Sequence, residues 1–131
     1  MFKILSALVA TIVATALMSA CSTLSDARSA KGTGMSREYA AAPDAVWKAL
    51  PKVLSELAVP VVSENRTEGV MLAQRGMTAF SYGENVAVFV DAVNGGSKTR
   101  VEVVSKKSMA TNVFAPDWAK DILDRLDEKL K

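Results

Sequence analysis

Two β-rich runs that flank a glycine turn constrain the fold of this chain more than any other feature. The runs cover residues 85–93 and 98–106, and the four residues between them are Asn94-Gly95-Gly96-Ser97. Paired glycines permit the positive φ angles of a tight turn, and such a turn joins two antiparallel strands. The sequence therefore predicts a long β-hairpin centred on Gly95 and Gly96.

The register of this hairpin follows from its turn. With Gly95 and Gly96 as the two turn residues, counting outward opposes Val90 to Val101, Val88 to Val103, Asp91 to Arg100 and Phe89 to Glu102. The valine pairs fall on one face of the sheet and the other two pairs fall on the opposite face. One dry face and one mixed face are expected of an antiparallel sheet that is covered on one side. We also expect Asp91 and Arg100 to form a weak cross-strand ion pair.

Two amphipathic helices are predicted, one before and one after the main run of strands. The first begins at Pro43-Asp44, and Pro51 lies inside it, so a bend is expected there. Its apolar stripe is Val46, Trp47, Leu50, Val53, Leu54 and Leu57. The second helix begins at Pro116. Its apolar stripe is Ala115, Ala119, Ile122, Leu123, Leu126 and Leu130, and its polar face is expected to pair Asp121 with Arg125 and Asp127 with Lys131.

Three shorter strands complete the predicted domain. They cover residues 36–41, 59–64 and 69–75, and the polar residues 65–68 join the last two as a hairpin. The element order is then strand, helix, four strands, helix. This order predicts an α+β fold in which an antiparallel sheet of about five strands carries both helices on one face.

The first twenty residues have the features of a secretory signal peptide. Lys3 supplies one positive charge, residues 4–18 are uncharged and mostly apolar, and two small residues precede Cys21. A transmembrane helix needs about 20 apolar residues, so this run is too short to be one. We expect residues 1–20 to be removed, residues 21–35 to form a flexible tether rich in small polar residues, and residues 36–131 to form the folded domain.

The run Leu17-Met18-Ser19-Ala20-Cys21 resembles the lipobox of bacterial lipoproteins. The resemblance implies that Cys21 is acylated and becomes the mature N-terminus, which anchors the protein to a membrane. Because Ser22 rather than aspartate follows the cysteine, it also implies export to the periplasmic face of the outer membrane. Cys21 is the only cysteine, so no intramolecular disulfide can form.

Three further runs resemble the helix-grip repeat of the BamC family of outer-membrane lipoproteins. They are residues 44–50, residues 53–57 and the C-terminal residues 122–126, which occur in the same element order. The resemblance covers residues 36–131 and implies one repeat where BamC has two. It implies an accessory role in outer-membrane assembly or maintenance. Related small lipoproteins of unassigned function share this pattern, and the resemblance places the chain among them.

The composition offers little for catalysis. The chain has no histidine, so neither a Ser-His triad nor a His-ligated metal site can be built. The acidic residues Asp117, Asp121 and Asp124 are expected to form a solvated helix face rather than a ligand set. The 16 Lys and Arg residues nearly balance the 14 Asp and Glu residues, which argues against nucleic-acid binding. We therefore expect no enzyme activity and no cofactor.

Two loops, residues 77–84 and 108–115, are expected to meet at one end of the sheet because each lies one hairpin away from the other. Their apolar residues are Met77, Phe80, Tyr82, Met109, Val113 and Phe114, with Trp118 close by. Two interpretations remain open: these side chains plug the end of the core, or they form an exposed patch for a protein partner or a lipid-like ligand. We expect Phe114 and Trp118 to be packed, and Phe80 and Tyr82 to be partly exposed.

The sequence thus favours a non-enzymatic envelope lipoprotein that acts as an interaction or accessory module. A carrier of a small hydrophobic or lipid-like ligand, held between helices and sheet, is the alternative. A hydrolase whose site is assembled from distant carboxylates is the third hypothesis, and no motif in the sequence supports it.

Overall fold

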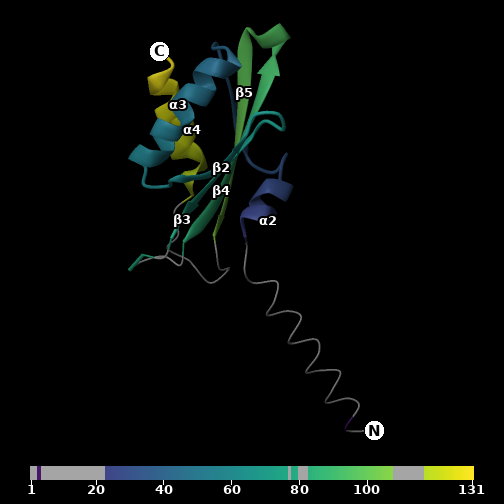
Figure 1. Ribbon diagram of the computed structural model, residues 1–131, viewed down its shortest axis with the longest axis vertical. Helices are drawn as coiled ribbons and strands as arrows, with labels where there is room; N and C mark the ends of the chain where they lie inside the picture. The colour runs from purple at the N-terminus through teal and green to yellow at the C-terminus, as the bar shows by residue number, and fades with distance from the viewer. Residues whose placement is uncertain (1–2, 4–22, 77, 80–82, 108–116) are drawn as a thin grey trace.

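A computed structural model describes residues 3, 23–76, 78–79, 83–107 and 117–131 (Figure 1). Five antiparallel strands form one sheet in the order β1-β5-β4-β3-β2. The strands are β1 (Met35–Tyr39), β2 (Val61–Asn65), β3 (Val70–Arg75), β4 (Glu84–Val93) and β5 (Lys98–Lys107), and the helices are α2 (Leu24–Ser29), α3 (Pro43–Glu56) and α4 (Trp118–Lys129). The predicted α+β fold with a five-stranded antiparallel sheet is confirmed.

The hairpin of β4 and β5 has the predicted register. Val90 opposes Val101, Val88 opposes Val103, Asp91 opposes Arg100 and Phe89 opposes Glu102. Its turn is a short 3₁₀ segment, η1 (Asn94–Gly96), in which the φ angles of Gly95 and Gly96 are 67° and 94°. Glycine adopts these positive φ angles without steric strain, so the glycine pair fixes both the turn and the register.

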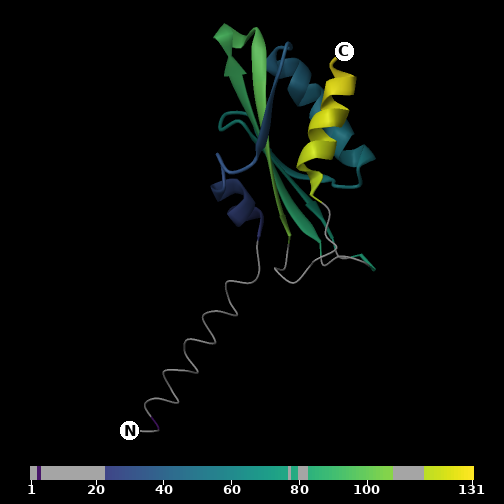
Figure 2. The ribbon, with the colours of Figure 1, turned by 180° about the vertical axis from the view of Figure 1, so that it is seen from behind.

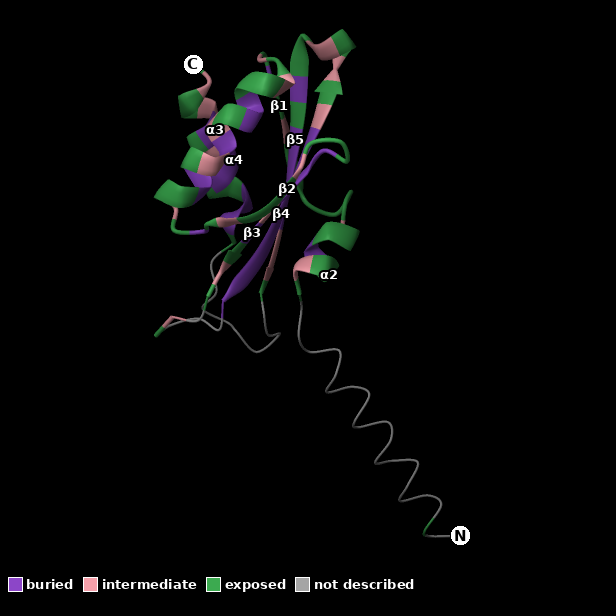
Figure 3. Cartoon of the chain, viewed as in Figure 1, coloured by how far each residue is buried: buried purple, intermediate pink, exposed green. Residues whose placement is uncertain are grey.

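Helices α3 and α4 cover one face of the sheet, as opposite views show (Figures 1 and 2). The described parts of both predicted apolar stripes are confirmed. The buried helix residues are Val46, Trp47, Leu50, Val53 and Leu54 in α3 and Trp118, Ala119, Ile122, Leu123 and Leu126 in α4. They pack on alternate strand residues, chiefly Met71, Ala73, Val86, Val88, Val90, Val101 and Val103. Burial does not alternate along β4: residues 84–90 are all buried, so both faces of the sheet are covered along this part of the strand (Figure 3).

The predicted starts of these two helices can be compared with the structure only in part. Helix α3 begins at Pro43 and continues through Pro51 to Glu56. Helix α4 is capped by Asp117, whose carboxylate accepts a hydrogen bond from the backbone N of Ala119 at 3.0 Å. The predicted start at Pro116 lies outside the described residues, as does Ala115.

One of the two predicted ion pairs on α4 is wrong. Asp127 pairs with Lys131 at 3.3 Å, as predicted. Arg125 instead lies 3.7 Å from Glu56 on α3, so its partner is not Asp121 of its own helix. Helices α3 and α4 pack side by side, and this packing offers Arg125 a carboxylate that its own helix periodicity does not reveal.

The prediction of a flexible tether over residues 21–35 is wrong for the described part of that segment. Residues 24–29 form helix α2, and Ala27 of this helix is fully buried against the second face of the sheet. Its neighbours there are Val70, Leu72, Ala87, Phe89 and Val104, with Ala30 beside it. Helix α2 therefore shields the apolar residues of the second face from water, and this burial stabilises the fold. Helix α2 thus lies on the face of the sheet opposite α3 and α4 (Figure 2).

The expected ion pair between Asp91 and Arg100 is also wrong, although the two residues are cross-strand neighbours as predicted. Arg100 binds Glu38 of β1 at 2.9 Å, and Asp91 binds Lys31, which follows α2, at 3.3 Å. Strand β1 and the segment after α2 bring these partners closer than the hairpin does. Ion-pair choice on this face is thus decided by elements distant in sequence.

Tyr39 ties β1 to the last helix. Its side chain is almost fully buried, and its hydroxyl donates a hydrogen bond to the carbonyl oxygen of Leu123 at 2.6 Å. Burial disfavours the phenolate, and it is the main reason why the pKa of Tyr39 is raised from 10.0 to about 12. The hydroxyl is therefore a structural donor.

This raised pKa predicts a loss of stability at alkaline pH. The unfolded chain releases its tyrosine proton first, so the stabilising contribution is complete below pH 10 and is lost as pH rises from 10 towards 12. Raising the pH from about 9 to about 11 should lower the free energy of unfolding of both proteins. We expect the loss to be about 1 kcal/mol larger in the unaltered protein than in Tyr39→Phe. Urea unfolding of both proteins at the two pH values measures it. Equal losses in the two proteins would contradict this assignment.

Candidate functional site

The residues that the sequence predicts to be functional lie mostly outside the described residues. These are the acylation site Cys21 and the candidate patch residues Met77, Phe80, Tyr82, Met109 and Phe114, together with Val113. Their predicted exposure or packing stays a prediction. Trp118 is described, and its predicted packing is confirmed because it is only 9% exposed and belongs to the core.

The described residues at the ends of both loops do meet at one end of the sheet. Glu84, at the start of β4, opposes Arg75 at the end of β3 and Lys107 at the end of β5. We call this the loop end of the sheet; the η1 turn marks the opposite end. The Arg75 guanidinium lies 5.3 Å from the ring of Trp118, and Glu84 is fully buried. The predicted convergence of the two loops is therefore confirmed for the residues that flank them.

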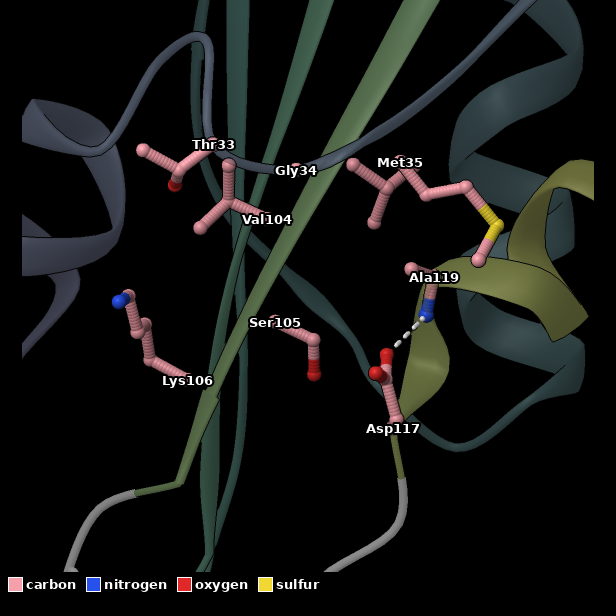
Figure 4. A pocket seen from close by; sticks show the side chains of 9 residues that line it. Thr33, Gly34, Met35, Val104, Ser105, Lys106, Asp117 and Ala119 are labelled. Carbon is pink, nitrogen blue, oxygen red and sulfur yellow. Dashed lines mark hydrogen bonds between the residues drawn. The ribbon is translucent and has the colours of Figure 1, made fainter.

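A cavity of about 420 Å³ lies beside the outer edge of β5, and we call it the edge cavity (Figure 4). It is lined by Thr33, Gly34, Met35, Val103, Val104, Ser105, Lys106, Asp117 and Ala119. The lining comes from both faces of the sheet, because residues 33–35 approach from the side of α2 and Asp117 and Ala119 from the start of α4. Only part of the lining is apolar.

The edge cavity exists because β1 is shorter than β5. The pairing of β1 with β5 ends at Met35 and Val103, whereas β4 pairs with β5 as far as Lys107. Before Met35 the chain leaves the edge towards α2, and Gly34 passes very close to the carbonyl group of Val103. Among the described residues, no strand therefore covers the outer edge of β5 beyond Val103.

The side chains of the edge cavity are not arranged for catalysis. Ser105 points to the side of α4 and Lys106 to the side of α2, so the lysine cannot act as a base on the serine hydroxyl (Figure 4). Asp117 caps α4, and the Ser105 hydroxyl accepts a hydrogen bond from the backbone N of Trp118 at 3.4 Å. Within the described residues, no group of three His, Cys, Asp or Glu side chains could hold a metal ion. Asp117 and Ser105 thus bind backbone N–H groups at the start of α4.

A nearly buried carboxylate forms a polar contact on the second face of the sheet. One oxygen of the Glu102 carboxylate accepts hydrogen bonds from the backbone N of Gly32 at 2.7 Å and of Gly34 at 2.9 Å. We call this contact the Glu102 clamp. Glu102 is only 8% exposed, and hydrogen bonds to a charged acceptor in such a setting are strong. The clamp fixes the chain between α2 and β1 to the sheet.

This contact was not predicted from the sequence, because residues 32–34 were expected to lie in a flexible tether. One local signal was available in Thr23 and Asp26, whose spacing is that of a capping box. In the structure the Thr23 hydroxyl accepts a hydrogen bond from the backbone N of Asp26, and the Asp26 carboxylate accepts one from the backbone N of Thr23. The partner of the two glycines, Glu102, is about seventy residues away and leaves no local trace.

The residues between helices and sheet pack against one another. Leu50, Leu54, Met71, Ile122 and Leu123 are among the fully buried side chains there. This packing does not favour a ligand held between the helices and the sheet, and the carrier hypothesis stays a prediction without a supporting observation.

Comparison with protein-family models and with curated protein sequences finds no match to this chain. Of the helices in the described part of the chain, none is both long enough and apolar enough to cross a bilayer.

Proposed function

We propose that this protein is a lipid-anchored envelope lipoprotein that is acylated at Cys21 and acts as a non-enzymatic interaction or accessory module. The observation that carries the proposal is the apolar run of residues 4–18, followed by two small residues and the only cysteine of the chain. A free thiol in this place has no role that the sequence or the described structure suggests. Acylation explains why a single cysteine follows such a run.

The described structure is in keeping with this proposal. The N-cap of α2 is Thr23, two residues after Cys21, so a cleaved and acylated cysteine would stand directly before this helix. A sheet with α3 and α4 on one face is also the arrangement that the resemblance to the BamC family implies. By that resemblance, the module acts at the periplasmic face of the outer membrane, with an envelope protein as its partner.

A Cys21→Ser variant tests the anchor. Mass spectrometry of the unaltered protein from the membrane fraction should reveal an N-terminal peptide that begins at Cys21 and carries lipid. The variant should lose the lipid and keep residues 1–20, because the cysteine thiol is the acceptor that precedes cleavage. A Ser22→Ala variant is the matched control and should be processed like the unaltered protein. An unmodified Cys21 thiol in a chain that keeps residues 1–20 would refute the proposal.

An experiment in the same cells tests whether the protein acts as an interaction module. Crosslinking in intact cells, followed by purification in detergent, should recover a defined envelope protein with the unaltered chain and with Ser22→Ala. Cys21→Ser should lose this species, because the unanchored chain is no longer held beside a membrane-bound partner. Recovery of the same partner with all three chains would show that the anchor is not needed for the interaction.

A further inference from the structure

Helix α2 leaves very little chain between the proposed anchor and the folded domain. The N-cap of α2 is Thr23, so Ser22 is the only residue between it and Cys21. Two residues of fully extended chain span at most about 7 Å. An acylated Cys21 therefore holds the start of α2 at the level of the lipid headgroups. The distance is far shorter than a flexible tether of 13 residues would allow, which is roughly 20 Å.

Helix α2 has a fixed position on the sheet, because residues of the helix and of the segment after it contact the sheet. Ala27 is fully buried against the second face, and Arg28 forms an ion pair with Glu68. After the helix, Lys31 binds Asp91 at 3.3 Å, and the Glu102 clamp holds the next residues. The start of α2 thus has a fixed position on the domain.

The direction of α2 along the sheet decides which end of the domain meets the anchor. Its later residues and the segment after it contact Glu68 and Asp91, which lie towards the η1 turn, and Glu102, which lies in the middle of β5. Its first residues lie towards the loop end of the sheet, and Figures 1 and 2 agree on this placement. The anchor is therefore joined at the loop end.

We propose that the docked α2 orients the domain, so that the loop end of the sheet faces the bilayer and the η1 turn points away from it. The inference rests on the proposed acylation of Cys21 and deepens it by naming the surface that meets the membrane. The exposed residues at this surface, within the described part of the chain, include Thr23, Gly76 and Lys107. Strand β5 has ten residues, so the η1 turn lies about 30 Å from the loop end.

Charge does not set this orientation. The loop end carries the cations Arg75, Lys106 and Lys107, but the acidic Asp26 and Asp117 lie at the same end. A mixed surface has no strong attraction to anionic lipid, so the short covalent connection is the cause. The orientation should accordingly persist on neutral lipid and at high salt, where surface charges are screened.

Quenching by the membrane tests the orientation in the acylated full chain. Cys21 is the only native cysteine and is consumed by acylation, so an introduced cysteine is the only free thiol. Gly76→Cys places a label at the loop end, where an added Cβ meets nothing within 4 Å, and Ser97→Cys places one beside the η1 turn. Each labelled protein is reconstituted in phosphatidylcholine vesicles that contain lipids with a nitroxide on the headgroup. We expect the label at position 76 to be quenched at least about threefold more than the label at position 97, because nitroxide quenching acts only over short distances and the η1 turn lies about 30 Å away.

The matched control is a flexible Gly/Ser insertion of twelve residues between Ser22 and Thr23, which leaves the folded part unchanged. It lengthens the connection to roughly 20 Å, and the quenching ratio should then fall towards one. A ratio near one in the protein without the insertion, when its mass includes the lipid, would overturn the orientation and leave the anchor standing. A mass without lipid, together with failure to bind vesicles, would overturn the proposed function and the orientation with it.

Discussion

Replacing Leu50 by alanine should lower the free energy of unfolding by about 3 kcal/mol. Leu50 lies in the middle of α3, is fully buried and belongs to the core between the helices and the sheet. The substitution removes apolar contacts and leaves a cavity that the surrounding residues fill only in part. Since domains of this size are stable by only about 5–15 kcal/mol, the loss is a large fraction of the total. Urea unfolding followed by the fluorescence of Trp47 and Trp118, both in the core, measures it.

Val62→Ala is the matched control for this substitution. Val62 is an apolar residue of β2 that is 56% exposed, so its loss should change stability by no more than about 0.5 kcal/mol. A similar effect of the two substitutions would mean that α3 does not pack on the sheet by its Leu50 face.

Replacing Gly34 by alanine should cost about 2 kcal/mol or more. A Cβ at this position would collide with the backbone carbonyl group of Val103 and with the side chain of Val104. Backbone atoms of a central hairpin cannot move away cheaply, so the chain between α2 and β1 must shift instead. The shift also disturbs the hydrogen bond from the backbone N of Gly34 to Glu102. The same urea titration measures the loss.

Gly76→Ala separates the collision from the general effect of replacing a glycine. An added Cβ at Gly76 meets nothing within 4 Å, so this variant should be within about 0.5 kcal/mol of the unaltered protein. If Gly34→Ala is as stable as Gly76→Ala, the chain does not cross the edge of β5 as described, and the Glu102 clamp falls with it.

The elements that the sequence predicted correctly are those whose signal is local. The stripe of α3 recurs at helical spacing, the β4–β5 hairpin alternates at strand spacing, and the glycine pair sets its turn. Such patterns depend only on neighbours within a few residues, so the register of Val90 against Val101 could be obtained by counting. The convergence of the residues that flank the two loops, at one end of the sheet, followed from the same strand order.

Only the proposed membrane anchor and the approximate region of the candidate site could be predicted from the sequence. The lipobox-like run that ends at Cys21 is a contiguous motif, so the sequence alone motivates the proposed anchor. The edge cavity has no such motif, because it arises from the unequal lengths of β1 and β5. A difference in where pairing stops appears only when the strands are placed side by side.

By itself the sequence determined the α+β order, the hairpin register and the two faces that α3 and α4 bury. Only the tertiary structure decided that residues 24–29 form a helix on the second face rather than a tether. A six-residue helix is unstable alone, because nucleation costs more than so few hydrogen bonds return. Its stability comes from contacts of the helix and of the segment after it with residues such as Phe89 and Glu102, which lie more than fifty residues away along the chain. Contacts between residues so far apart along the chain leave no periodic pattern in the sequence from which they could be predicted.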